Sequence, residues 1–193
     1  MNRVISTSEK EMVKKRPESL LTNFLADLLL EEAKIDAETN NSEINPTISY
    51  FNYGGIRTFL PKGEITVGKI FELMPFENEM VYLQLTGNQI QEFLNQIAEK
   101  GGISIGGVRF IISNEQAKSV QINGVDIKLN EKYWLVTNDY IAEGGDGLTV
   151  FTQRLKMIKS GKKIRDIIIN HLEQKYKNGK VITAKLDGRV SNE

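Results

Sequence analysis

Asn123-Gly124 is the feature that most constrains the fold of this chain. The pair joins two short segments of strand character, 119–122 and 125–129, and asparagine and glycine both accept the positive φ angles of a tight hairpin turn. A two-residue connection can join only antiparallel neighbours, because a parallel pair needs a much longer crossover. At least part of the predicted sheet is therefore antiparallel.

Further helices and strands are mixed along the rest of the chain. Apolar side chains at helical spacing predict helices at 17–34, 87–100 and 162–176. Segments with strand character occupy 47–52, 79–87, 107–112 and 132–138. No internal repeat and no convincing linker interrupts this order. We therefore expect one α+β domain over residues 1–193, with a largely antiparallel or mixed sheet.

The composition excludes several kinds of site. Lysine plus arginine equals aspartate plus glutamate, at 25 each, so the formal net charge is zero and DNA or RNA binding is not expected. No segment approaches the roughly 20 consecutive apolar residues of a membrane span. Cysteine is absent, and the single histidine, His171, falls on the apolar face of the helix predicted at 162–176, where we expect a core or interface residue. A metal site with several histidine ligands cannot be assembled here, so we expect no metal ligand and no catalytic residue.

Three segments carry residues suited to binding a ligand, and the first is 52–57, at the end of a predicted strand. Gly54 and Gly55 allow backbone amides to approach a ligand closely. Beside them, Asn52 can donate and accept hydrogen bonds, and Arg57 presents a planar guanidinium suited to phosphate or carboxylate. The alternative is an ordinary bend with a salt-bridging arginine.

The second segment, 74–78, places Phe76 directly after a proline on a loop. Phe76 either fills a gap in the core or presents an aromatic face to a flat ligand. In the second case Asn78 would form a hydrogen bond to the edge of that ligand. The sequence of this segment alone leaves both alternatives open.

The third segment, 138–147, places an aspartate among glycines. Residues on either side of Asp146, including Gly145, are free to adopt unusual backbone angles, so the carboxylate can be aimed as a two-point acceptor for the vicinal hydroxyls of a sugar. Tyr140, a few residues upstream, can stack on a base. An aspartate-containing turn without a ligand is the alternative.

Together these segments resemble the C-terminal, substrate-binding domain of the 5′-nucleotidase family, which includes bacterial UDP-sugar hydrolases and the animal ecto-5′-nucleotidase. The resemblance covers about residues 18 to 190 and implies a four-layer α/β/β/α fold. It rests on N-x-G-G-I-R at 52–57, G-x-I-T at 63–66, P-F-x-N at 75–78, L-T-G at 85–87, G-G-V-R-F at 106–110, N-D-Y-I-A-x-G-G-D-G at 138–147 and D-G-R-V at 187–190.

The resemblance also implies roles for the nucleoside-binding residues. Phe76 and Tyr140 would sandwich the nucleobase, and each stacking contact of this kind contributes about 1–3 kcal/mol. Asn78 would contact the base, and Asp146 the ribose hydroxyls. Position 140 is a departure, because Tyr stands where Phe is usual; the π face is kept and a polar group is added.

For the phosphate, the resemblance implies Arg57 with Asn52. Better-studied members of the family carry a further phosphate-binding arginine on the first helix. Alignment through Thr22-Asn23 places Ala26 at that position here. Phosphate affinity, or the choice of phosphoester, is therefore expected to differ from those members.

The D-x-H and G-N-H-[DE] motifs, with which the family binds two metal ions on a separate calcineurin-like domain, do not occur in this chain. We expect the chain by itself to be inactive and to complete a hydrolase of the 5′-nucleotidase type, with the divalent metal pair on another domain or chain. The alternative is an inert nucleoside-binding or protein-interaction scaffold. In a third, weaker possibility, autonomous activity of another class, Asp146 or Glu143 would have to act without help from a metal or a histidine. The resemblance implies a periplasmic or extracellular location.

Overall fold

The computed structural model describes residues 1–193 and is built around a mixed four-stranded sheet. In the centre of this sheet, β4 is antiparallel to both of its neighbours, β8 and β9, whereas the edge strand β2 runs parallel to β8. The strand order is β2-β8-β4-β9, with bounds Pro46–Ser49, Lys132–Asn138, Glu79–Thr86 and Lys156–Lys163.

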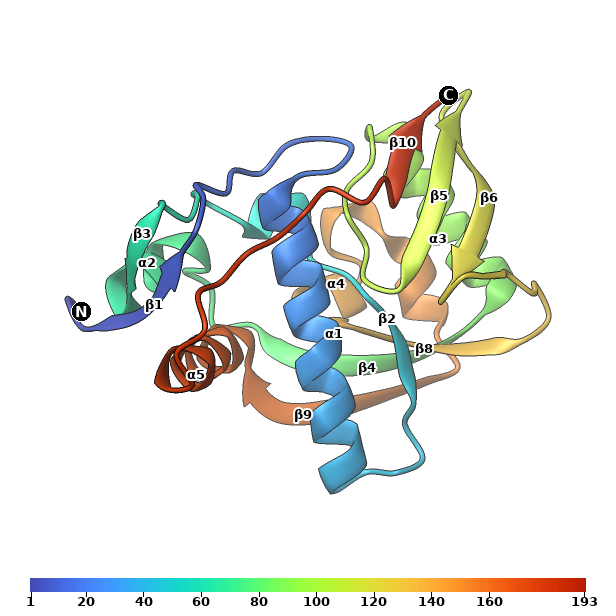
Figure 1. Cartoon of the computed structure of the whole chain (residues 1–193). Coiled ribbons are helices and arrows are strands. Elements are labelled where there is room, and N and C mark those ends of the chain that lie inside the picture. The colour runs from blue at the N-terminus through green and yellow to red at the C-terminus, as the bar shows by residue number, and fades with distance from the viewer.

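Both faces of the central sheet are buried, and the period of two along β4 shows why. Met80 and Tyr82 join one apolar cluster, and Val81 and Leu83 join the other. Helices α1 (Leu20–Asn40), α2 (Val67–Leu73) and α5 (Ile164–Lys177) contribute to the first cluster, and α3 (Gly87–Glu99) and the second sheet to the other (Figure 1).

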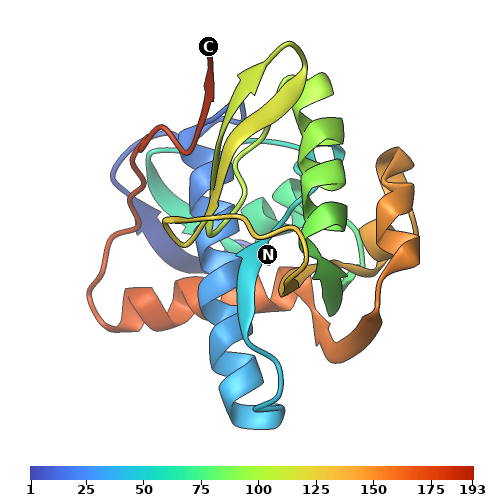
Figure 2. The ribbon, with the colours of Figure 1, turned by 90° about the vertical axis from the view of Figure 1, so that its right-hand side faces the viewer.

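The second sheet is smaller and contains the predicted hairpin. Its order is β10-β5-β6-β7, with bounds Val190–Asn192, Val108–Ser113, Gln116–Ile122 and Val125–Asp126. Asn123 and Gly124 have φ angles of 50° and 79°, so the predicted two-residue turn between antiparallel strands is confirmed. Figure 2 shows α3 running beside β5 and β6. The expected α/β/β/α fold consists here of the two four-stranded sheets with helices α1 and α5 on one side and α3 on the other. The α+β class is confirmed.

Two of the three predicted helices, α1 and α3, begin at side-chain caps. Ser19 accepts a hydrogen bond from the Thr22 amide at the start of α1, and Thr86 accepts one from the Gln89 amide at the start of α3. In both cases the third helical residue bonds back to the cap, which satisfies two of the free amides of the first turn. The apolar stripe predicted on α3 lies entirely in the core, at Ile90, Phe93, Leu94 and Ile97.

Strand β9 was not predicted, because Lys156–Lys163 carries four lysines and little apolar character. It lies at the edge of the central sheet and pairs only with β4, so its outward groups face water. A two-stranded sheet of β1 (Val4–Ser8) and β3 (Gly63–Thr66) lies beside α5. None of the helices combines the length and the apolar content that crossing a membrane requires.

His171 is buried on α5, as the sequence predicted, and contacts a second helix. It is 5% exposed, and its Nδ1 is 2.7 Å from Oε1 of Glu32 on α1. The single histidine therefore joins α5 to α1 and lies on a different part of the chain from the three candidate segments.

Candidate functional site

The topology of the central sheet brings the three candidate segments together. Strands β2 and β8 are parallel, so the segments that follow Ser49 and Asn138 leave the sheet at the same end. Strand β4 is antiparallel to β8, with Met80 opposite Asn138, so the segment that precedes β4 lies at this end too. Residues far apart in sequence are therefore neighbours here.

Asn52 is the junction between the first and the third segments. It is 5% exposed and precedes the short 3-10 helix η1 (Tyr53–Gly55). Its Nδ2 donates to Oδ2 of Asp146 (3.0 Å), and its Oδ1 accepts from Nδ2 of Asn138 (3.2 Å). A Cβ at Gly55 would lie 2.7 Å from the Asn52 Oδ1, so a glycine is required for the Asn52 side chain to occupy this place.

Arg57 follows η1 and is exposed. Its Nη1 donates to the Gly54 carbonyl at 3.3 Å, and no carboxylate of the chain lies within ion-pair distance of it. The alternative of a salt-bridging arginine at a bend is therefore wrong. Most donors of the guanidinium are free to bind an anion.

The third segment forms a hydrogen-bonded loop. Strand β8 ends at Asn138, which caps the short helix α4 (Asp139–Ala142) by accepting from the Ile141 amide at 2.8 Å. The Tyr140 hydroxyl donates to Oδ1 of Asp146 at 3.0 Å and accepts from the Asp146 amide at 3.2 Å. Asp146 has φ 54°, a left-handed conformation that aspartate tolerates better than most residues.

Gly145 is required by the position of the tyrosine ring. A Cβ at this residue would lie 2.5 Å from Cε1 and 2.6 Å from the carbonyl oxygen of Tyr140. Tyr140 remains 49% exposed despite this close contact. The glycine-rich turn predicted at 144–147 therefore allows the Tyr140 ring to lie against the backbone and to form hydrogen bonds with Asp146.

The second segment presents its aromatic residue to solvent. Phe76 is 48% exposed, so the alternative of a core residue is wrong. Phe76 and Asn78 line a small cavity together with Asn52 and Gly55, and Asn78 also lines a shallow hollow beside Tyr140 and Gly145. All nine residues predicted to bind substrate therefore lie at this end of the sheet: Asn52, Gly54, Gly55, Arg57, Phe76, Asn78, Tyr140, Gly145 and Asp146.

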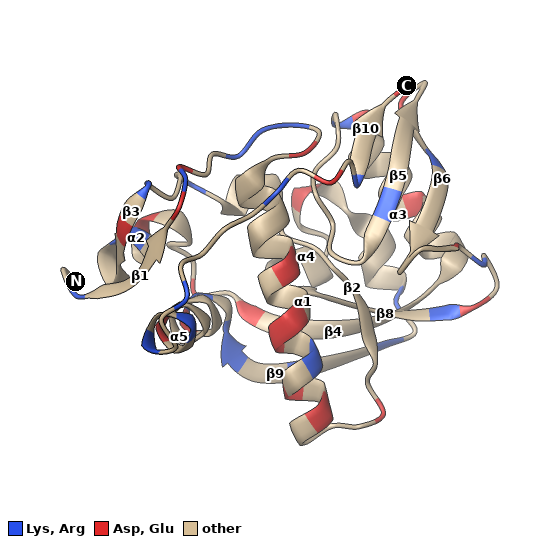
Figure 3. Cartoon of the chain, in the orientation of Figure 1, with Lys and Arg blue, Asp and Glu red and all other residues tan.

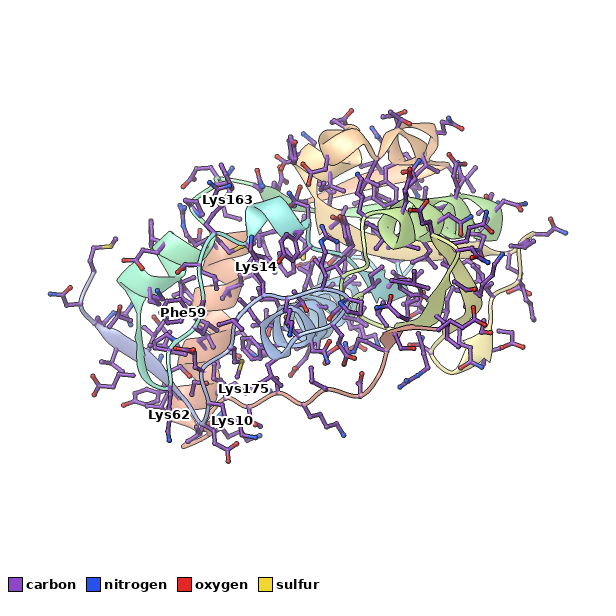
Figure 4. All side chains as sticks on the ribbon, turned by 90° about the horizontal axis from the view of Figure 1, so that it is seen from above. Lys10, Lys14, Phe59, Lys62, Lys163 and Lys175 are labelled. Atoms are coloured by element: carbon purple, nitrogen blue, oxygen red, sulfur yellow. The ribbon has the colours of Figure 1, made fainter.

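The loop that carries Phe76 is held by the start of α5. Arg165 is 7% exposed, and its guanidinium carbon lies 4.0 Å from the centre of the Phe71 ring. Its Nη1 donates to the carbonyl of Pro75 at 3.1 Å, and its Nη2 pairs with Glu77. Nearby, Lys163 Nζ donates to the carbonyl of Glu77 at 2.7 Å (Figure 4).

Sequence reasoning missed a group of cations beside η1. Lys14 Nζ donates to the carbonyls of Tyr53 (3.0 Å) and Ile56 (2.6 Å), and Figure 4 shows Lys14 beside this part of the chain. Nζ of Lys14 and the guanidinium carbon of Arg16 each lie 4.3 Å from the centre of the Tyr53 ring. Burial, followed by the charges of Arg57 and Arg16, lowers the pKa of Lys14. Three cations are thus close enough to repel one another, an arrangement that an anion would stabilise.

The basic run at 14–16 was visible in the sequence, but nothing local placed it next to η1, about 40 residues downstream. A fourth cation, Lys100, donates to the Asp146 carbonyl at 2.6 Å. Figure 3 shows that basic and acidic residues are otherwise interspersed over the chain. The cations near η1 are therefore a local feature of a neutral protein.

Ala26 does not lie on the surface that carries these cations. It is 1% exposed, its carbonyl accepts from the Ser49 hydroxyl at 2.6 Å, and a Cβ on Gly106 would lie 2.9 Å from that carbonyl oxygen. A side chain at position 26 is enclosed between α1 and β2. The effect of Ala26 on phosphate binding stays a prediction, and the cations near η1 come from the segment before α1 and from Arg57.

No group of three or more histidine, aspartate or glutamate side chains is placed to hold a metal ion. The donors at this end of the sheet are amides, guanidinium and ammonium groups, and the carboxylates include those of Asp146, Asp139 and Glu143; the two oxygens of Asp146 accept from Tyr140 and Asn52. Such a donor set suits an anionic, hydrogen-bonding organic ligand better than a cation.

Fold and surface together define an α+β domain that gathers aromatic, acidic and basic side chains from separate loops at one end of its central sheet. The chain belongs to the 5′-nucleotidase C-terminal domain family, whose sequence model matches residues 4–153. It is 33% identical over 189 residues to the trifunctional nucleotide phosphoesterase protein YfkN of Bacillus subtilis, covering 90% of this chain and 12% of that protein.

Two further similarities agree with this membership. A 5′-nucleotidase of Vibrio vulnificus is 27% identical over 159 residues, covering 80% of this chain and 27% of the relative. The crystal structure of a 5′-nucleotidase precursor from Thermus thermophilus superposes with a TM-score of 0.82 at 29% identity, covering 98% of this chain and 39% of that one. The chain thus spans well under half the length of these proteins.

Proposed function

We propose that this chain is the nucleotide-binding part of a phosphoester hydrolase of the 5′-nucleotidase type. The observation that supports this most is the hydrogen-bonded set of Asn52, Tyr140 and Asp146, which shares one end of the central sheet with exposed Phe76 and the cations near η1. A nucleotide has the matching parts: a flat base, a ribose with vicinal hydroxyls, and a phosphate.

Each part of the nucleotide has a binding group in this proposal. Phe76 and Tyr140 stack on the base, with Asn78 at its edge. The Asp146 carboxylate accepts hydrogen bonds from the ribose hydroxyls. Arg57 binds the phosphate as a planar, two-point donor, and the field of Lys14 and Arg16 adds to its attraction.

We assign the hydrolytic step to a divalent metal pair held on another domain or chain, which would supply polarisation of the phosphoester and an activated water. The residues of this chain bind and orient the nucleotide for that step and carry no proton transfer of their own. Relatives of this chain include a cell wall protein of Listeria monocytogenes, and we place the present protein in the periplasm or outside the cell, in nucleotide breakdown.

Titration of the ¹⁵N-labelled chain with adenosine, AMP and a UDP-sugar, followed by NMR, tests the proposal even for weak binding. We expect amide shifts at residues 52–57, 76–78 and 140–146. Phe76→Ala should weaken AMP binding about tenfold or more. Phe59→Ala, which removes another exposed aromatic ring, is the matched control and should leave binding unchanged.

If none of the three ligands shifts these amides, with or without a metallophosphoesterase partner, the proposal is wrong. The alternative of an inert scaffold predicts that the double variant Phe76→Ala, Tyr140→Ala leaves the activity of an assembled hydrolase unchanged. Ala26, which stands where better-studied members of the family carry an arginine, is the observation that favours this alternative.

A further inference from the structure

The hydroxyl of Tyr140 makes two hydrogen bonds to a single residue. It donates to Oδ1 of Asp146 (3.0 Å) and accepts from the amide of the same residue (3.2 Å). Both residues are exposed at the surface, and Asp146 lies in a left-handed conformation within a glycine-rich turn. Without the hydroxyl, nothing from helix α4 would fix the orientation of this carboxylate.

The second carboxylate oxygen is held from the other side. Oδ2 of Asp146 accepts from Nδ2 of Asn52 (3.0 Å), which is buried and in turn accepts from Asn138 (3.2 Å). Asn138 caps the helix that carries Tyr140 by accepting from the Ile141 amide, so the series of side chains from Tyr140 through Asp146 and Asn52 to Asn138 begins and ends on helix α4. The two sides of the carboxylate are thus fixed to the same short piece of backbone.

This arrangement leaves a definite acceptor capacity on Asp146. A carboxylate offers about four lone-pair sites, two on each oxygen. Tyr140 uses one site on Oδ1, and Asn52 uses one on Oδ2. One site on each oxygen remains, and two neighbouring acceptors of this kind match two neighbouring hydroxyls on one sugar ring.

We infer that the Tyr140 hydroxyl is a positioning group that holds Asp146 as a two-point acceptor, so that the pocket selects ligands with a vicinal diol. This inference rests on the proposed function. In this inference the Tyr140 ring stacks on the base, and the Tyr140 hydroxyl acts only through Asp146. Tyr140→Phe removes the hydroxyl and keeps the stacking ring.

The test compares adenosine with 2′,3′-dideoxyadenosine, which has the same base and lacks both hydroxyls. Dissociation constants are measured by NMR titration for the wild-type chain, Tyr140→Phe, Asp146→Asn and Tyr176→Phe. Tyr176 is an exposed tyrosine on α5 without a side-chain hydrogen bond and provides the matched control. We expect Tyr140→Phe to weaken adenosine binding about tenfold, as removal of a hydrogen bond to a charged group does, and to leave dideoxyadenosine binding unchanged.

A readout without ligand accompanies the titration. The Asp146 amide donates to the Tyr140 hydroxyl, so its hydrogen exchange should become faster in Tyr140→Phe and stay the same in Tyr176→Phe. The inference is supported if Tyr140→Phe loses the preference for adenosine over dideoxyadenosine and its Asp146 amide exchanges faster.

Two outcomes overturn the inference. If Tyr140→Phe weakens both ligands equally, the hydroxyl supports the stacked ring or the fold rather than the diol site. If it changes neither, while the wild type still prefers adenosine and Asp146→Asn abolishes that preference, the proposed function stands and the positioning role is wrong. Binding of neither ligand by the wild type refutes the proposed function itself, and the inference falls with it.

Discussion

Arg165→Met should detach the loop that carries Phe76 from the rest of the domain. The arginine is 7% exposed; it donates to the Pro75 carbonyl and pairs with Glu77 on this loop, and its guanidinium stacks on Phe71 of the preceding helix α2. Methionine fills a similar volume without the charge or the donors, so the substitution removes these contacts with little loss of packing.

The magnitude follows from the individual contacts. The cation–π contact contributes about 0.5–2 kcal/mol, and a hydrogen bond from the charged guanidinium to a carbonyl contributes about 1.5–3 kcal/mol. The pair with Glu77 adds less than about 1 kcal/mol, because the Glu77 side chain is 68% exposed. We expect a total loss of about 2–4 kcal/mol, since such contributions are not fully additive.

Urea unfolding measures this loss, and ligand titration shows where it acts. Because the loop carries Phe76 and Asn78 but not Arg57, adenosine binding should weaken strongly while inorganic phosphate binding stays the same. Glu77→Gln, which removes only the exposed ion pair, is the control and should cost less than about 1 kcal/mol. Equal weakening of adenosine and phosphate, or no change in either, would refute the assignment of Arg165 to the base half of the pocket.

Three further predictions concern the core, the turn and pH. Phe93→Ala, at a fully buried position, should lower the free energy of unfolding in urea by about 3–5 kcal/mol; less than about 1 kcal/mol would contradict the packing described. Gly145→Ala should abolish nucleoside shifts in NMR but preserve the far-UV circular dichroism, since its Cβ would overlap the Tyr140 ring; unchanged binding would contradict this geometry. Burial raises the pKa of Asp36, but hydrogen bonds from Lys162 and other neighbours outweigh it and bring the pKa below its ordinary value of 3.8. The charged form therefore stabilises the fold above that pH, and the difference in unfolding free energy between wild type and Asp36→Asn should shrink as pH falls below about 4; a constant difference would contradict it.

The elements that the sequence predicted are those whose signal is local. Helix α3 was found from its apolar stripe, and the hairpin from Asn123-Gly124, because each depends on residues within a few positions of one another. Strand β9 was missed since an edge strand needs only one neighbour and tolerates the lysines that suggest a loop.

The candidate site divides in the same way. Each of the three loops could be recognised from its own residues and from the family resemblance, but the hydrogen bond between Asn52 and Asp146 spans 94 positions. The exposure of Phe76 and the approach of Lys14 to η1 depend likewise on how distant segments pack. A sequence pattern gives the parts of such a site, and tertiary structure decides which of them meet.

The junction of β9 and α5 has a consequence for how the domain can be divided. The match to the family's sequence model ends at residue 153, before β9, α5 and Arg165. A fragment cut there would keep all the recognisable binding motifs. It would also lose an edge strand of the central sheet, the buried apolar face of α5 and the support of the Phe76 loop. The segment that can be recognised by its motifs is therefore shorter than the folded unit that supports the Phe76 loop.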